Sequence, residues 1–238
     1  MPKAGCASYN AQMSSTLLDE IAAAAARLVV DEGMEYAAAK RKAQRALGRH
    51  GQGRAELPAN EQEEDEVREY LAIFCADTQP TELLVLRRLA LVWLARLAEF
   101  RPHLAGAVWR GTATRLSAIH LDLYCDDTKA TEIALINKGV AYDVGSRPAS
   151  RGGEVDLLRI ATRCPEFGEP VTLFLSILDH DDLRGALKPD ARGRSWRGDI
   201  TALQRLLGDD RSGQASDNGS NNASDTAAKH PPDHGAAA

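Results

Sequence analysis

Residues 106–123, GAVWRGTATRLSAIHLDL, decide the fold of this chain. The pattern predicts one strand over residues 104–109 and a second, of alternating apolar and polar residues, over residues 119–125. Gly106 and Gly111 permit backbone conformations and close approaches that other residues resist. By itself, the stretch therefore predicts two strands joined by a turn that the glycines shape.

The same residues closely resemble the entry motif of the polymerase-β-type nucleotidyltransferase fold. In that family a Gly-Ser pair opens the motif, an Arg-Gly pair follows, and Asp-x-Asp lies on the next strand. The resemblance extends over about half the chain, from Leu104 to about Asp182. The aligned residues in this chain are, in order, Gly106, Ala107, Arg110, Gly111, Ala118 and His120.

The resemblance implies a nucleotide triphosphate ligand and two magnesium ions held by carboxylates. Both carboxylates are missing at the aligned positions, because Ala118 offers no ligand and the imidazole of His120 suits zinc, copper or iron better. Asp122 lies two residues further along the same strand face. Asp156, in a predicted strand, is the counterpart of the family's third carboxylate. The sequence therefore predicts a degenerate member with a regulatory or binding role.

The predicted ligand is a nucleotide or another phosphate-bearing small molecule. Residues 184–197, RGALKPDARGRSWR, add arginines and glycines to the motif, and guanidinium groups bind phosphate bidentately. A polar loop held by local ion pairs explains this segment equally well. The residues predicted to bind the ligand are Gly106, Arg110, Gly111, Thr112, Ser117, Arg184, Lys188 and Arg194.

Two alternatives remain open. The first is an active transferase with a displaced metal site built from Asp122, Asp156 and Asp126, in which a substrate hydroxyl attacks an α-phosphate. Magnesium is expected only in that case, and the candidate metal ligands are His120, Asp122 and Asp156. The second alternative is a protein-interaction module, in which the N-terminal helices bind a protein partner and the sheet is an inert scaffold.

Helical patterns in the first hundred residues, followed by strand patterns, predict an α+β fold with a mixed or antiparallel sheet. We expect about four helices over residues 15–100 and a nucleotidyltransferase-like domain over 101–207. Residues 1–14 and 208–238 are predicted to be disordered; the tail has almost no large apolar side chains. The elements expected after residue 125 are a helix over 130–138, strands over 140–144, 154–161 and 171–178, and helices over 182–187 and 199–207.

Composition narrows the possible functions. The formal net charge of −5 does not suggest a dedicated nucleic-acid surface, and four scattered cysteines argue against a disulfide scaffold or zinc ribbon. The chain begins without an apolar signal core, and its most apolar window is interrupted by arginines, so we expect a cytoplasmic protein without a membrane segment. Neither a Walker-type phosphate loop nor a Rossmann glycine motif occurs. An acidic run over 61–69 is predicted to be the solvated start of a helix; a partner-binding surface is its alternative interpretation.

Overall fold

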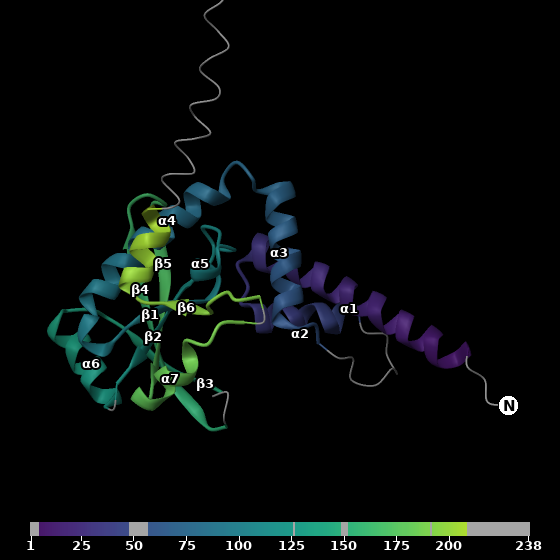
Figure 1. Ribbon diagram of the computed structural model, residues 1–238. Helices are drawn as coiled ribbons and strands as arrows, with labels where there is room; N and C mark the ends of the chain where they lie inside the picture. The colour runs from purple at the N-terminus through teal and green to yellow at the C-terminus, as the bar shows by residue number, and fades with distance from the viewer. Residues whose placement is uncertain (1–4, 48–56, 126, 149–151, 191, 209–238) are drawn as a thin grey trace, which may run out of the picture.

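The structure is a computed structural model that describes residues 5–47, 57–125, 127–148, 152–190 and 192–208. Helices come first, and a six-stranded mixed sheet follows (Figure 1). This arrangement confirms the predicted α+β class. Within the described residues, no helix is both long enough and apolar enough to cross a membrane.

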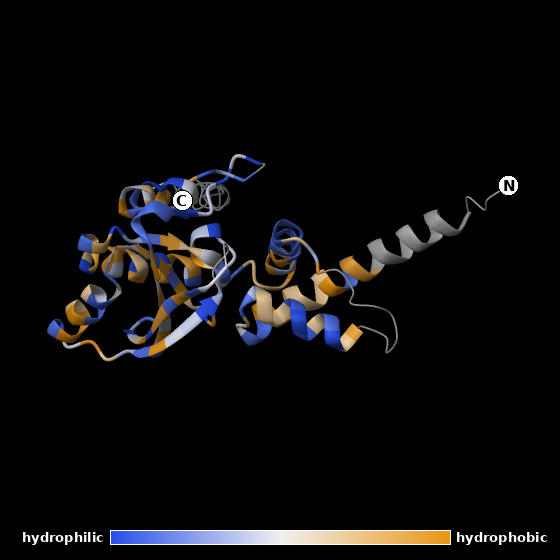
Figure 2. Cartoon of the chain, turned by 90° about the horizontal axis from the view of Figure 1, so that it is seen from below, coloured by the Kyte–Doolittle hydropathy of each residue, from blue (hydrophilic) through white to orange (hydrophobic). Residues whose placement is uncertain are grey.

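The helical half consists of α1 (Gly5–Glu32), α2 (Tyr36–Leu47) and α3 (Asn60–Phe74). It lies beside the strands (Figure 2) and has a hydrophobic core of its own. That core includes Ile21, Val29, Ala39, Val67 and Leu71. Helix α1 begins at Gly5, within the segment 1–14 for which disorder was predicted. The predicted tail lies outside the described residues from residue 209 onward.

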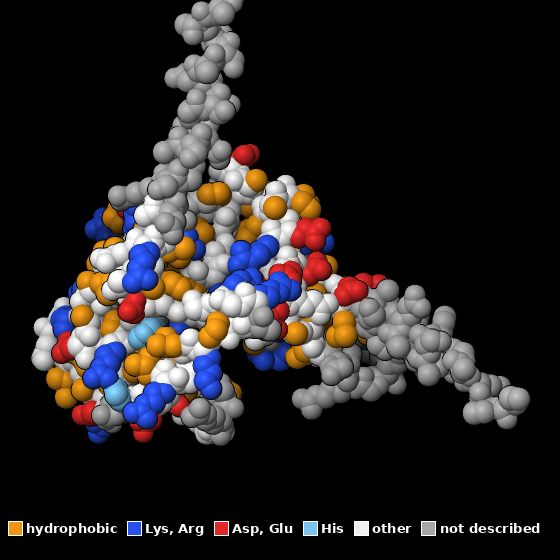
Figure 3. All heavy atoms as spheres, viewed as in Figure 1, with side chains coloured by type: hydrophobic (Ala, Val, Ile, Leu, Met, Phe, Trp, Pro, Cys, Tyr) orange, Lys and Arg blue, Asp and Glu red, His pale blue; other side chains and the backbone are white. Residues whose placement is uncertain are grey.

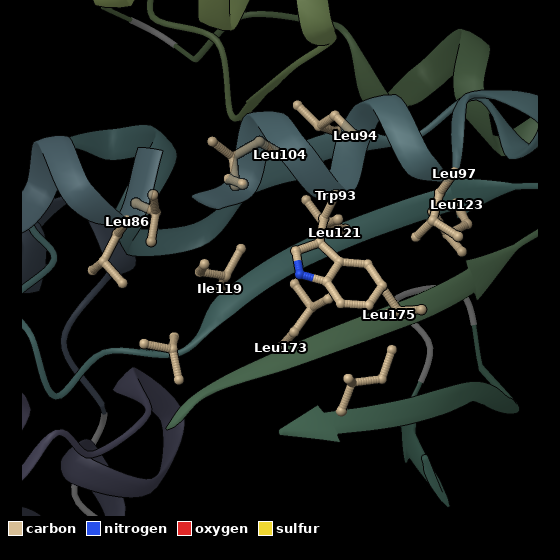
Figure 4. Packing of buried hydrophobic residues seen from close by; sticks show 14 of the residues in the cluster. Leu86, Trp93, Leu94, Leu97, Leu104, Ile119, Leu121, Leu123, Leu173 and Leu175 are labelled. Carbon is tan, nitrogen blue, oxygen red and sulfur yellow. The ribbon is translucent and has the colours of Figure 1, made fainter. Parts of the chain in front are cut away.

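Helix α4 (Gln79–Arg96) packs on the sheet, and the sheet half of the protein therefore begins with this helix. Pro80 stands in its first turn, where a missing N–H costs nothing. Its buried Leu86 and Trp93 belong to the same core as Leu121 and Leu173 (Figure 4), and the indole of Trp93 donates a hydrogen bond to Thr162 at 3.0 Å. The two cores consequently divide between α3 and α4 rather than near the predicted boundary at residue 100.

The sheet has the strand order β3-β4-β5-β2-β1-β6. Only the pair β2 and β5 is parallel among the described strands, and the other neighbours are antiparallel. The prediction located β2, β4 and β5 well, whereas β3 begins three residues later than expected. The strands are β1 (His103–Ala105), β2 (Ile119–Tyr124), β3 (Asp143–Pro148), β4 (Glu154–Cys164), β5 (Glu169–Leu178) and β6 (Arg197–Gly198).

The prediction of a strand over 104–109 is wrong beyond residue 105. A short helix, α5 (Gly106–Arg110), follows β1 and contains Ala107. Gly106 has a φ of 68° and Gly111 a φ of 84°, a left-handed conformation that side chains other than glycine rarely adopt. The first glycine turns the chain out of the strand and the second ends the helix, so the motif is strand, helix, loop and strand.

The remaining helices lie close to their predicted positions. Asp127 caps α6 (Thr128–Asn137) by accepting a hydrogen bond from the backbone N–H of Lys129, and Gly139 follows the helix with a φ of 65°. A 3-10 turn, η2 (His180–Asp182), leads into α7 (Leu183–Ala186). A second 3-10 turn, η1 (Ala98–Phe100), follows α4, and residues 200–208 form the last described helix.

Candidate functional site on the open face of the sheet

The two faces of the sheet differ in chemistry. Along β2, Ile119, Leu121 and Leu123 point into the core that α4 covers, so His120 and Asp122 point to the opposite face. We call this opposite face the open face. Strand pairing adds a row of neighbours on it, because paired residues point to the same side. His120 pairs with Phe174, Phe174 with Arg159, and Asp122 with Ser176.

Asp122 lies at the centre of the open face, and its side chain is only 8% exposed. The Nη1 atom of Arg197 lies 2.7 Å from its Oδ2 atom, and the Nη2 atom of Arg147 lies 3.8 Å from its Oδ1 atom. Arg197 comes from β6 and Arg147 from β3, the two edge strands of the sheet. Two guanidinium groups from opposite edges therefore converge on one nearly buried carboxylate.

His120 connects the sheet to the helical half. Gly106 lies so close to it that a Cβ atom at residue 106 would be 3.2 Å from the imidazole. The Nε2 atom of His120 is 2.9 Å from a carboxylate oxygen of Glu35, and its ring stacks on Phe174 with 5.2 Å between centroids. Burial by itself raises the pKa of Glu35, but the hydrogen bond and charge of His120 bring this pKa below its ordinary value. Glu35 is thus held as a carboxylate beside the imidazole.

A cleft of about 350 Å³ opens next to this histidine. Gly33 and Glu35 of the helical half form one wall, and Phe174 lies on the sheet side. Two arginines line it as well, and each is already paired: Arg115 with Glu169 at 2.5 Å and Arg159 with Asp143 at 2.7 Å. Its remaining lining residues are Leu116, Ser117, Ala118, Glu169, Pro170, Val171 and Thr172.

A smaller cavity of about 50 Å³ adjoins the cleft and shares four of its lining residues. Gly106, Ser117 and His120 are among the residues that line it. Its volume suits ordered water, whereas the larger cleft falls within the range of small-molecule sites. Of the predicted ligand-binding residues, Gly106 and Ser117 therefore do border a cavity.

Arg110 and Arg194 line neither cavity and lie in a different place. Together with Arg68, Glu64 and Asp190 they form an arginine–carboxylate cluster. The guanidinium of Arg110 is 2.6 Å from Glu64 and 3.2 Å from Asp190, and Arg194 is 3.1 Å from each of these acids. Positive and negative side chains meet between α3 and the sheet half in Figure 3. Arg194 is thus held by Asp190 within the segment and by Glu64 of α3 outside it.

The acidic run is accordingly only partly solvated, contrary to the prediction. Glu63 is 0% and Glu64 is 4% exposed. Glu64 belongs to the arginine–carboxylate cluster, and the amino group of Lys40 on α2 lies 3.0 Å from Glu63. Two residues of the run therefore join α3 to neighbouring elements.

The other predicted ligand-binding residues face neither cavity. Thr112 is buried, and its hydroxyl lies 2.8 Å from that of Tyr36. The backbone carbonyl of Gly111 accepts a hydrogen bond from Gln79 at 3.1 Å. Arg184 and Lys188 are exposed, in α7 and just after it. The predicted pocket is therefore not one site.

One alternative was a displaced metal site that combines Asp122 with Asp156. The structure does not bring these two carboxylates together. In the register of the sheet Asp156 pairs with Ile177, a core residue, whereas Asp122 pairs with Ser176 on the open face. Their side chains point to opposite sides of the sheet. Asp126 lies outside the described residues. Within the described ranges, no group of three or more histidine, cysteine or acidic side chains is placed to hold a metal ion.

The two positions aligned with the carboxylate pair do not both lie on a strand. Ala118 precedes β2, so the strand positions on the open face are His120 and Asp122. Sequence reasoning missed Glu35 and Arg147, because they come from segments far from the motif. Arg197 is the last residue of the segment 184–197 that the sequence offered as a phosphate-binding candidate. A signal did exist for Ser176, since a hydroxyl within the apolar run LFLSIL is unusual for a strand buried on both faces.

Comparison with known proteins does not assign the chain to a family. No protein-family model, no curated protein and no solved structure matches it.

Proposed function

We propose that this protein binds a nucleotide, through its phosphates and its base, on the open face of the sheet in a regulatory or binding role. The observation that carries the proposal is the pair of arginines around Asp122. This carboxylate stands two residues from His120, the residue against which the first glycine of the motif packs. The resembled fold would bind a nucleotide triphosphate at this place.

The cleft supports a nucleotide rather than a simple anion. Its volume of about 350 Å³ lies at the lower end of the range for small-molecule sites. Phe174 is half-buried and lines it, and a base can stack on an aromatic ring. The imidazole of His120 stacks on one face of Phe174, so a base would stack on the other face.

The spacing of residues along β5 shows how far the cleft lies from the arginine pair. Phe174 and Ser176 point to the same side of the strand and are separated by one repeat, about 6–7 Å. Ser176 accepts a hydrogen bond from Arg147 at 3.2 Å. A base stacked over Phe174 would therefore have its phosphates within reach of Arg147.

The charge arrangement favours binding over transfer. Metal-assisted phosphoryl transfer needs carboxylates that are free to hold a pair of cations. Here Asp122 is already neutralised by arginine, and Asp156 is on the other side of the sheet. Stable binding of a phosphate group needs none of these metal ligands.

Phe174→Ala tests the proposal. The variant should bind nucleoside triphosphates about tenfold more weakly, since stacking of one base on an aromatic ring contributes about 1–3 kcal/mol. Isothermal titration with each of the four common triphosphates measures the effect. Phe74→Ala is the matched control, because Phe74 is an exposed phenylalanine on α3. The proposal fails if the native protein binds none of the four nucleotides, or if the two variants bind them equally well.

A further inference from the structure

The arginine pair carries an inference that rests on the proposed function and extends it to the way the phosphates are held. In the described structure each oxygen of the Asp122 carboxylate faces one guanidinium group. Arg197 approaches Oδ2 at 2.7 Å, and Arg147 approaches Oδ1 at 3.8 Å. In a two-metal site, a pair of metal ions would supply the two positive charges beside such a carboxylate.

Neighbouring hydroxyl groups position both guanidinium groups. The Nε atom of Arg147 donates to the hydroxyl of Ser176 at 3.2 Å, and Nη1 of Arg197 donates to the hydroxyl of Tyr124 at 2.5 Å. These contacts come from β5 and β2, the central strands. Each arginine therefore bridges from an edge strand to the middle of the sheet and is held there in a defined orientation.

The pair also has charge to offer a ligand. Asp122 neutralises one positive charge, which leaves the second guanidinium uncompensated by this carboxylate. The side chain of Arg147 is 40% exposed, so it is accessible to a ligand while it contacts Asp122. The Nε atom of Arg197 is buried and has no hydrogen-bond partner within the described residues. Arginine keeps its charge at all ordinary pH values and suits phosphate geometry.

We propose that Arg147 and Arg197 stand in for the metal ions of the resembled fold. They bind the terminal phosphates of the nucleotide directly, and the complex forms without a divalent cation. The chemical class of the group bound at Asp122 is thus a polyphosphate, carried by a nucleotide whose base occupies the cleft.

The test is isothermal titration of the full chain with ATP and with inorganic tripolyphosphate, each in EDTA and in excess magnesium. We expect both ligands to bind in EDTA at least as tightly as in magnesium, because magnesium neutralises the phosphates that the arginines bind. Arg147→Ala should weaken both ligands at least tenfold, and Arg147→Lys should recover part of that loss. Arg163→Ala is the control, because Arg163 is exposed on β4 and lines neither cavity.

The outcomes distinguish a failure of the arginine inference from a failure of the proposed nucleotide binding. Binding that requires magnesium, or equal affinities for Arg147→Ala and Arg163→Ala, would overturn the arginine inference and leave nucleotide binding intact. Tripolyphosphate binding that depends on Arg147, without any ATP binding, would support the arginine site and overturn the nucleotide proposal. Failure of both ligands to bind the native protein under either condition would overturn both.

Discussion

Replacement of Glu64 by alanine is expected to lower the free energy of unfolding by about 3–5 kcal/mol, the usual cost of removing one partner from a buried ion pair. Glu64 receives guanidinium groups from Arg68, Arg110 and Arg194. The side chain of Arg110 is only 7% exposed, so water cannot replace the missing carboxylate. Asp190 would remain as the sole acid of the arginine–carboxylate cluster.

Urea denaturation followed by circular dichroism measures this loss. The matched control is Glu69→Ala on the same helix, because Glu69 is exposed. Its effect should stay within about 0.5 kcal/mol, as for most surface substitutions. A loss for Glu64→Ala no larger than that of Glu69→Ala would show that the cluster contributes little to the stability of the fold.

The second large effect concerns Glu63 and the pH dependence of stability. Burial raises the pKa of Glu63 to about 7, against the opposing hydrogen bond and charge of Lys40. The folded protein therefore binds a proton at this carboxyl more tightly than the unfolded chain does. The resulting stabilisation is fully present below the unfolded pKa of 4.5, and it is lost as pH rises through about 7. At about 1.4 kcal/mol per pKa unit, the loss amounts to about 3 kcal/mol.

Glu63→Gln removes the titrating group while it keeps the shape of the side chain. Free energies of unfolding at several pH values between about 4 and 8 should fall more steeply with rising pH in the native protein than in this variant. The difference between the two profiles isolates residue 63 from the other carboxylates. Parallel profiles would contradict the prediction, and Glu69→Gln provides the profile of an exposed glutamate on the same helix.

The fold could be predicted where local periodicity determines it. Neighbouring residues determine the apolar alternation of β2, β4 and β5. They also determine the cap that Asp127 provides for α6. The motif loop could not be predicted in the same way, because Gly106 permits either a strand turn or a helix start. Its conformation is fixed by contacts from distant helices, among them the bond from Gln79 to the carbonyl of Gly111.

The candidate site was predictable only in part, for a similar reason. Asp122 and His120 stand out within a single strand. Whether Asp156 shares their face depends on the register of three strands, which a single strand does not encode. The arginines that surround Asp122 come from the two edges of the sheet, and their sequence positions gave no indication that they would meet.

The arginine–carboxylate cluster has a consequence for the order in which this protein can be completed. Arg194 follows Glu64 by 130 residues, so the helical half leaves the ribosome long before the loop that supplies two of its charged partners. Until that loop has been synthesised, Glu64 can pair only with Arg68 and Arg110. The arginine–carboxylate cluster therefore cannot be complete until Asp190 and Arg194 have been synthesised.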